Sequence, residues 1–286
     1  MELAICVRNL PADELTEVGR FAEENGYAEV FVPDGAHGGM LDADGRLHGR
    51  DAIATLAAMF CRTTTVRGTL GVAALPMHHQ LVLPVLASTL NELSDGRFSL
   101  GIGVSHPEQT ANFGIEFPTQ QIDYMRGWVR ELKDRASRGM GYGTDWPVLI
   151  AALGPRMVEL GAEEADGLIL NWLTPEQAAA SVERIHAAAP EGASPRIALY
   201  VRLMTNAVSY SDAVRYDAMA NYHRNFLAQG LATADEIVAG TTLSRDDLGA
   251  ARARLDQYRS AGIDTVCLYP MAFDETDRRA LEQLTR

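Results

Sequence analysis

The sequence has few cysteines and no long uninterrupted apolar run. Three of its 286 residues are cysteine, and Cys6, Cys61 and Cys267 do not have the spacing of a metal site. A chain of this length does not need disulfides, and each cysteine lies in an apolar stretch, so all three are predicted to be reduced and buried. No apolar segment approaches the roughly 18 residues of a membrane span, and the acidic start of the chain is unlike a signal peptide. We therefore expect a cytoplasmic protein that does not enter a membrane.

Positive charge is also scarce. The chain has 25 Lys and Arg against 38 Asp and Glu, which gives a net charge of −13. Such a chain repels phosphate backbones, so nucleic acid is not an expected partner, although a local pocket still admits an anionic substrate or cofactor. The 47% hydrophobic and 22% charged residues are near the average for folded soluble proteins. A disordered chain, a collagen and a coiled coil are therefore excluded.

Short apolar runs alternate with longer amphipathic runs along the chain, a pattern typical of β-α units and a parallel sheet. The apolar runs predict eight strands, at Leu3–Val7, Glu29–Val32, Val66–Leu75, Arg97–Val104, Pro147–Leu153, Gly167–Leu173, Arg196–Thr205 and Thr265–Tyr269. The amphipathic runs predict helices at Ala12–Asn25, Arg50–Arg62, Leu81–Leu93, Thr119–Ser137, Pro155–Ala165, Pro175–Ala189, Ser211–Gln229, Arg245–Ala261 and Asp274–Leu284. The strands carry Val, Ile and Leu on both faces, which indicates a sheet covered on both sides.

Eight such units in fewer than 300 residues predict an α/β protein with one (β/α)₈, or TIM-barrel, domain over residues 1–286. A doubly wound sheet is the alternative. It would normally carry a glycine-rich turn after the first strand, and Arg8–Pro11 contains no glycine. Two long segments, Asp34–Gly49 and Ser105–Pro118, follow the second and fourth strands. Barrel enzymes keep their active sites at this end of the strands, so these segments are predicted to be lids or binding loops.

Two turns at predicted strand ends are suited to a ligand. Gly101 and Gly103 permit close approach of another group to the backbone, although a tight turn explains them equally well. Gly154, Pro155 and Arg156 open the helix after the fifth strand, where N–H groups and the helix dipole favour an anion. Arg156 would add a guanidinium there. An ordinary capped helix is the alternative, but two such turns on one barrel face favour a phosphorylated ligand.

Candidate acid–base residues follow the second and fourth strands. His37 is suited to act as a general acid, and Asp34 to orient it. On spacing alone, an aspartate in a local turn beside a solvated histidine is the favoured interpretation. His106 and Glu108 are candidates by position, whereas the adjacent pair His78–His79 is expected to cap a helix or face solvent. The motifs of zinc enzymes, dithiol enzymes, serine hydrolases and P-loop proteins are missing from the sequence, and no metal is predicted.

The segment Thr89–Pro107 closely resembles the signature of the bacterial luciferase-like flavin and deazaflavin oxidoreductases. Further matches at Gly49–Ala52 and Ala151–Met157 extend the resemblance over nearly the whole chain, and Asn221–Phe226 is similar to the branch that uses coenzyme F420. The resemblance implies a TIM barrel that is a homodimer and binds F420, or alternatively FMN, at its mouth. It implies hydride transfer between the deazaflavin and a small carbonyl, enone or alcohol. An FMN-dependent monooxygenase and a barrel that has lost catalysis are the alternatives.

The resemblance also implies positions for the cofactor. Gly71 and Val72 match a bulge in the third strand that often holds a non-prolyl cis peptide behind the coenzyme ring. The other implied cofactor contacts are Gly103, Val104, Ser105, His106, Ala152, Gly154, Pro155 and Arg156.

Catalytic and substrate positions are implied in the same way. Asp34 and His37 fall where members of the family keep an acidic residue and a catalytic histidine, although two residues separate them here. His37 or Glu108 would then exchange the proton. Asn171 and Trp172, after the sixth strand, are placed on the substrate side, with simple packing an equal alternative for Trp172.

Overall fold

The computed structural model describes residues 1–7, 10–34, 50–137, 145–204, 206–270 and 273–286. Eight of the strands in this part of the chain form one closed parallel barrel, in the order β6-β5-β4-β3-β2-β1-β9-β7, with β7 paired back to β6. They are β1 (Glu2–Cys6), β2 (Glu29–Val32), β3 (Arg67–Ala74), β4 (Phe98–Gly103), β5 (Val148–Ala151), β6 (Gly167–Asn171), β7 (Arg196–Met204) and β9 (Thr265–Pro270). The two-residue strand β8 (Leu243–Ser244) pairs with Leu203 and Met204 at the carboxyl end of β7. The predicted single-domain TIM barrel is confirmed.

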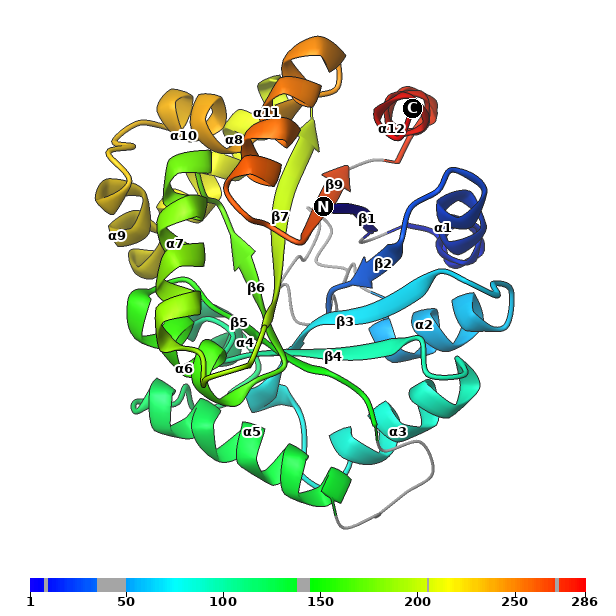
Figure 1. The fold of residues 1–286 in the computed structure, drawn as a ribbon, viewed down its shortest axis with the longest axis vertical. Coiled ribbons are helices and arrows are strands. Elements are labelled where there is room, and N and C mark those ends of the chain that lie inside the picture. Colours follow the sequence, from blue (N-terminus) through cyan, green and yellow to red (C-terminus); the bar gives the residue numbers. More distant parts are fainter. Residues whose placement is uncertain (8–9, 35–49, 138–144, 205, 271–272) are drawn as a thin grey trace.

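Helices surround the strands and connect them (Figure 1). They are α1 (Ala12–Glu24), α2 (Ala52–Phe60), α3 (Leu83–Leu93), α4 (Pro107–Asn112), α5 (Gln121–Ser137), α6 (Pro155–Glu164), α7 (Pro175–Ala188), α8 (Asn206–Asp217), α9 (Ala220–Ala228), α10 (Ala234–Thr241), α11 (Leu248–Ser260) and α12 (Glu275–Leu284), with a 3₁₀ turn, η2, at Leu75–Met77. The last helix, α12, lies against α1, where the Tyr27 hydroxyl donates to the Leu281 carbonyl at 2.9 Å. The first and last helices therefore lie side by side on the outside of the barrel (Figure 1).

Two of the predicted helices have different bounds in the structure. The stretch predicted as one helix from Ser211 to Gln229 forms α8 and α9, with a turn between them. Helix α11 begins after Asp247, whose side chain accepts a hydrogen bond from the Ala250 N–H at 3.0 Å. The short helices α4 and α10 were not predicted. The sequence does carry a signal for α10, because Thr233 and Glu236 form a capping box at its start.

The interior of the barrel is filled by small, aliphatic and aromatic side chains. They are Ala4, Cys6, Phe31, Leu149, Ile169, Ala198, Cys267 and Tyr269. A larger apolar cluster lies between the strands and the surrounding helices. Alternate residues of a strand point to opposite faces, so β1, β2, β5, β6, β7 and β9 each contribute buried residues to both clusters.

The prediction of buried cysteines is confirmed for Cys6 and Cys267 but wrong for Cys61, which is exposed. Cys61 is the first residue after α2, where Phe60 takes the buried position and the chain turns toward solvent.

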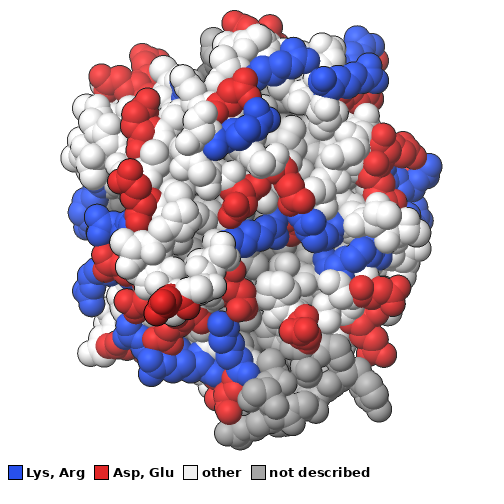
Figure 2. Space-filling model, in the orientation of Figure 1, with Lys and Arg blue, Asp and Glu red and all other residues white. Residues whose placement is uncertain are grey.

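One face of the molecule carries acidic and basic side chains in mixed clusters (Figure 2). On the face shown in Figure 2, Asp and Glu lie between Lys and Arg in most places rather than apart from them. Within the described ranges, no helix combines the length and the apolar character needed to cross a membrane. Among the same residues, no group of three His, Cys, Asp or Glu side chains is placed to hold a metal ion.

Candidate functional site

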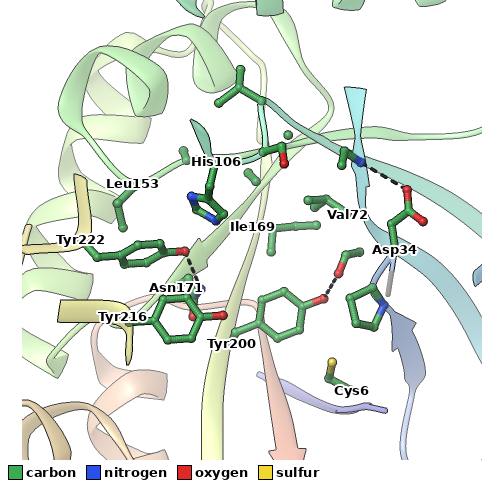
Figure 3. Close-up of a pocket in the computed structure, with 18 of the residues that line it drawn as sticks. Cys6, Asp34, Val72, His106, Leu153, Ile169, Asn171, Tyr200, Tyr216 and Tyr222 are labelled. Carbon is green, nitrogen blue, oxygen red and sulfur yellow. Dashed lines mark hydrogen bonds between the residues drawn. The ribbon is translucent and has the colours of Figure 1, made fainter. Parts of the chain in front are cut away.

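A pocket of about 240 Å³ opens at the carboxyl ends of the barrel strands (Figure 3). Parallel strands place these ends on one rim, so loops far apart in sequence meet there. Nine of the residues predicted for the site line the pocket: Asp34, Gly71, Val72, Gly103, Val104, Ser105, His106, Ala152 and Asn171. Ala151 and Leu153 also line it, and Gly154, Pro155 and Arg156 continue directly from Leu153 as exposed residues. His37 lies outside the described residues.

One wall is formed by the bulge in β3. A cis peptide bond joins Gly71 to Val72, and the pairing of β3 with β4 shifts register between Leu70 and Ala73. The Tyr200 hydroxyl donates to the Gly71 carbonyl at 2.5 Å, and burial raises the pKa of this phenol. A Cβ at position 71 would lie 2.5 Å from the Tyr200 hydroxyl oxygen, so only glycine fits. The tyrosine thus fixes the wall in place.

The two glycines of β4 serve the packing of this wall. A Cβ on Gly101 would lie 2.6 Å from the Leu70 carbonyl oxygen, and one on Gly103 would lie 2.9 Å from a methyl group of Val72. The close approach that the sequence predicted is therefore made by the neighbouring strand β3. Gly103 packs closely against Val72 and also lines the pocket, where it is open to a ligand.

His106 projects into the pocket from the start of α4. Its ring lies 5.6 Å, centroid to centroid, from that of Tyr222. Burial lowers the pKa of His106, an effect that Glu108 opposes and Arg215 reinforces. Its Nδ1 atom is buried and has no hydrogen-bond partner among the described residues. His106 therefore presents a neutral imidazole to the pocket, while Glu108 lies exposed in the first turn of α4.

Asp34 pairs with a histidine that the sequence analysis placed elsewhere. Its Oδ2 atom lies 2.6 Å from Nε2 of His78 and accepts a hydrogen bond from the Ala74 N–H at 3.4 Å. Both side chains are mostly buried, at 6% and 15% exposure. Asp34 follows β2 and His78 follows β3, and these strands are neighbours in the sheet. The sequence could have indicated this pair, because β2 and β3 correspond to consecutive strands of the predicted barrel and so are neighbours.

The opposite side of the pocket is polar. Asn171 donates through Nδ2 to the Tyr222 hydroxyl at 3.1 Å and accepts a hydrogen bond from Arg202. Trp172 is not among the residues that line the pocket. It is buried, with its ring 5.8 Å from that of Phe226, centroid to centroid. Trp172 is thus packed among other side chains, and its place on the substrate side stays a prediction.

The first turn of α6 is open beside the pocket. Gly154 occupies the N-cap position, no side chain caps the helix, and Pro155 is its first residue. A Cβ on Gly154 would meet nothing within 4 Å. Arg156 is exposed and makes no hydrogen bond or ion pair within the described part of the chain. An uncapped helix start with an adjacent guanidinium suits a phosphate, so these residues fit the coenzyme that the resemblance implied.

The fold and the pocket define a TIM-barrel protein with a cavity at the carboxyl ends of its strands. The family model of luciferase-like monooxygenases matches residues 6–265. The chain belongs to this family.

Known relatives include both reductases and dehydrogenases. The chain is 23% identical over 206 residues to 5,10-methylenetetrahydromethanopterin reductase of Methanolobus tindarius, covering 65% of this chain and 60% of the relative. It is 27% identical over 176 residues to the F420-dependent glucose-6-phosphate dehydrogenase of Nakamurella multipartita, covering 54% and 51%. These matches thus span between half and three fifths of the relatives' length.

Solved structures with the same fold cover the whole chain. An F420-dependent secondary alcohol dehydrogenase in complex with an F420-acetone adduct aligns with a TM-score of 0.81 at 15% identity, over 100% of this chain and 99% of that one. The oxygenating constituent of 3,6-diketocamphane monooxygenase from Pseudomonas putida, in complex with FMN, aligns with a TM-score of 0.69 at 16% identity, over 100% and 97%. At these identities the likeness shows the fold.

Proposed function

We propose that this protein is an oxidoreductase that transfers hydride between coenzyme F420 and a small organic carbonyl, enone or alcohol. The observation that carries the proposal is the continuity of the site. The wall of Gly71 and Val72, the β4 end at Gly103 and the open start of α6 at Gly154 follow one another around one rim. A ring system against the wall and a phosphate at α6 would together use this whole path.

The names of the relatives favour F420 over FMN. One of the two relatives described above is F420-dependent by name, and so is the structural neighbour with the higher TM-score. FMN remains the alternative because another neighbour binds it. Both coenzymes carry a phosphate, so the α6 site by itself does not distinguish them.

The proposed roles of the residues follow from their positions. Bound F420 would supply the hydride chemistry, and the protein would supply orientation, exclusion of water and a proton. Gly154, Pro155 and Arg156 would hold the phosphate. Asp34, which is hydrogen-bonded to His78, would hold a proton at the edge of the pocket. His106 is neutral and would contact the bound molecules by hydrogen bonding without adding charge.

Equilibrium titration with the two coenzymes tests the proposal. The purified protein, freed of bound small molecules, is titrated separately with F420 and with FMN, and binding is followed by coenzyme fluorescence. Saturable binding of F420, with FMN at least tenfold weaker, is the expected result. Tighter binding of FMN would support the monooxygenase alternative. Failure to bind either coenzyme would support a barrel without catalysis.

A further inference from the structure

A fully buried arginine faces the pocket from β7. Arg202 is 1% exposed, yet it is one of the residues that line the cavity. It lies in the segment Val201–Leu203, between two buried apolar side chains. A buried guanidinium is costly unless it is paired and hydrogen-bonded, so its contacts indicate what this position is for.

The contacts of Arg202 fix its plane and use two of its three nitrogens. Its Nε donates to Oδ2 of Asp212 at 3.2 Å, and its Nη1 donates to Oδ1 of Asn171. The guanidinium carbon lies 3.9 Å from the centroid of the Trp172 ring and 5.0 Å from that of Tyr216. No described residue accepts a hydrogen bond from Nη2. The N–H groups of Nη2 and the second N–H of Nη1 are therefore left for a ligand.

The charges around Arg202 do not balance. Asp212 is 4% exposed and its other carboxylate oxygen is taken by Arg215. One carboxylate thus lies between two guanidinium groups, which leaves one positive charge in excess. Asp34 is the one acid among the described lining residues, and Figure 3 shows it across the pocket from Asn171 and Tyr222. This excess stands out in a chain with a net charge of −13.

The surroundings of this charge include phenol and amide side chains. Tyr216, Asn221 and Tyr222 line the same side of the pocket, and the Tyr216 and Tyr222 rings lie 4.7 Å apart, centroid to centroid. Hydrogen bonds to an anion are strengthened in such a setting, because the effective dielectric constant is lower than in water. In the order of the barrel strands, β6 lies between β7, which carries Arg202, and β5, which precedes the proposed phosphate turn at Gly154.

We propose that Arg202 binds a carboxylate of the substrate, which makes the substrate class of this enzyme small organic acids with a reducible carbonyl or conjugated double bond. Nη2 of Arg202 donates to one carboxylate oxygen, and the polar side chains of Tyr216 and Asn221 lie within the same lining. The assignment to the substrate rests on the proposed hydride transfer. The anion subsite itself does not.

Calorimetric titration with benzoate and its neutral analogue benzamide tests the proposal, using the wild-type protein with and without saturating F420. We expect benzoate to bind at least about tenfold more tightly than benzamide, since a charged hydrogen bond supplies an interaction of that size. We expect Arg202→Met to remove this preference. Arg259→Gln, which changes an arginine that pairs with Asp256 on the surface, is the control and is expected to keep it.

The outcomes separate this proposal from the proposed function. Equal affinity of the wild-type protein for benzoate and benzamide overturns the subsite, whether or not Arg202→Met folds. A preference for benzoate that survives in folded Arg202→Met, verified by circular dichroism, also overturns it. If benzoate displaces F420, the Arg202 guanidinium belongs to the coenzyme site, and this result overturns its substrate role. Arg202-dependent benzoate binding without any F420 binding supports the anion subsite and contradicts the proposed function.

Discussion

At the scale of the residue, the most informative positions are those whose change leaves the protein itself undisturbed. Gly154 has an extended backbone conformation that any residue adopts, and its missing side chain would enter open space. Arg156 makes no interaction with described residues. Changes at these two positions therefore report on a ligand rather than on folding.

We expect Arg156→Ala to weaken F420 binding by about tenfold to a hundredfold, the size of one charged hydrogen bond. Gly154→Val is expected to weaken it further, because a β-branched side chain crowds the backbone that the phosphate approaches. Melting temperatures, measured beside the affinities, are expected to stay within about 2 °C of wild type for Arg156→Ala. Unchanged affinity in both folded variants would remove the α6 turn from the site.

The three cysteines are expected to differ in reactivity. Cys61 is exposed, whereas Cys6 and Cys267 are buried in the barrel interior. A thiol reagent is therefore expected to label one cysteine rapidly in the native protein and all three after denaturation. The Cys61→Ser variant is the control, with no rapid labelling. Rapid labelling of a second thiol in native protein contradicts the described interior.

The residues of the site were predictable to different degrees. Positions at strand ends, such as Gly71, Gly103 and Asn171, follow from the order of strands alone, because a parallel barrel brings all strand ends to one rim. Partners do not follow from that order. Asp34 was expected to act with His37, only three positions away, but its observed partner is His78, which arrives from the next strand. Arg202 was read as part of an apolar strand, and only the packing shows that it is buried and faces the pocket.

At the scale of the element, Glu23 joins the end of α1 to the segment that leads into β3. Its Oε1 atom accepts hydrogen bonds from the N–H groups of Thr64, at 2.7 Å, and Val66, at 3.0 Å, and also from Thr65. Burial opposes ionisation, but these hydrogen bonds outweigh it and lower the pKa of Glu23 from 4.5 to about 2. The ionised form therefore stabilises the fold.

We expect Glu23→Gln to lower the free energy of unfolding at pH 7 by about 1 kcal/mol, a modest value because the carboxylate is partly exposed. A lowered pKa contributes stability that is fully present above the unfolded pKa of about 4.5 and is lost as the pH falls through about 2. The difference between wild type and variant should thus shrink over that range in urea unfolding curves. A difference that is constant from pH 7 to pH 2.5 contradicts this account.

The elements themselves were largely predictable, and their ends were not. Eight strands and most helices follow from the alternation of apolar and amphipathic runs. The division between α8 and α9 depends on tertiary packing. Tyr216 and Tyr222 lie on either side of that division, and both line the pocket. One continuous helix would not bring both side chains to it.

At the scale of the whole molecule, a buried ion cluster ties four strands together at the amino ends of the barrel. Glu29 on β2 is fully buried and binds Arg196 on β7 and Thr69 on β3. Arg196 also donates to the Thr265 hydroxyl on β9 at 3.0 Å. The cluster lies at the end of the barrel away from the pocket, so it contributes to stability rather than to binding.

Glu29→Ala is expected to lower the free energy of unfolding by about 3 kcal/mol, because it leaves the Arg196 guanidinium without its partner in a mostly buried place. Glu2→Ala is the matched control. Glu2 pairs with Arg67 at the surface, and its loss is expected to cost less than about 1 kcal/mol. Equal effects of the two substitutions in denaturant unfolding would show that the cluster does not hold the barrel. The homodimer implied by the sequence stays a prediction, for which light scattering is the measurement.

The most direct test of the account is a crystal structure of the protein soaked with F420. The account predicts electron density for the deazaflavin ring against Gly71 and Val72, with the phosphate at the first turn of α6 beside Gly154 and Arg156. Density for the ring or the phosphate at any other part of the barrel, in crystals where the pocket is accessible, would contradict it.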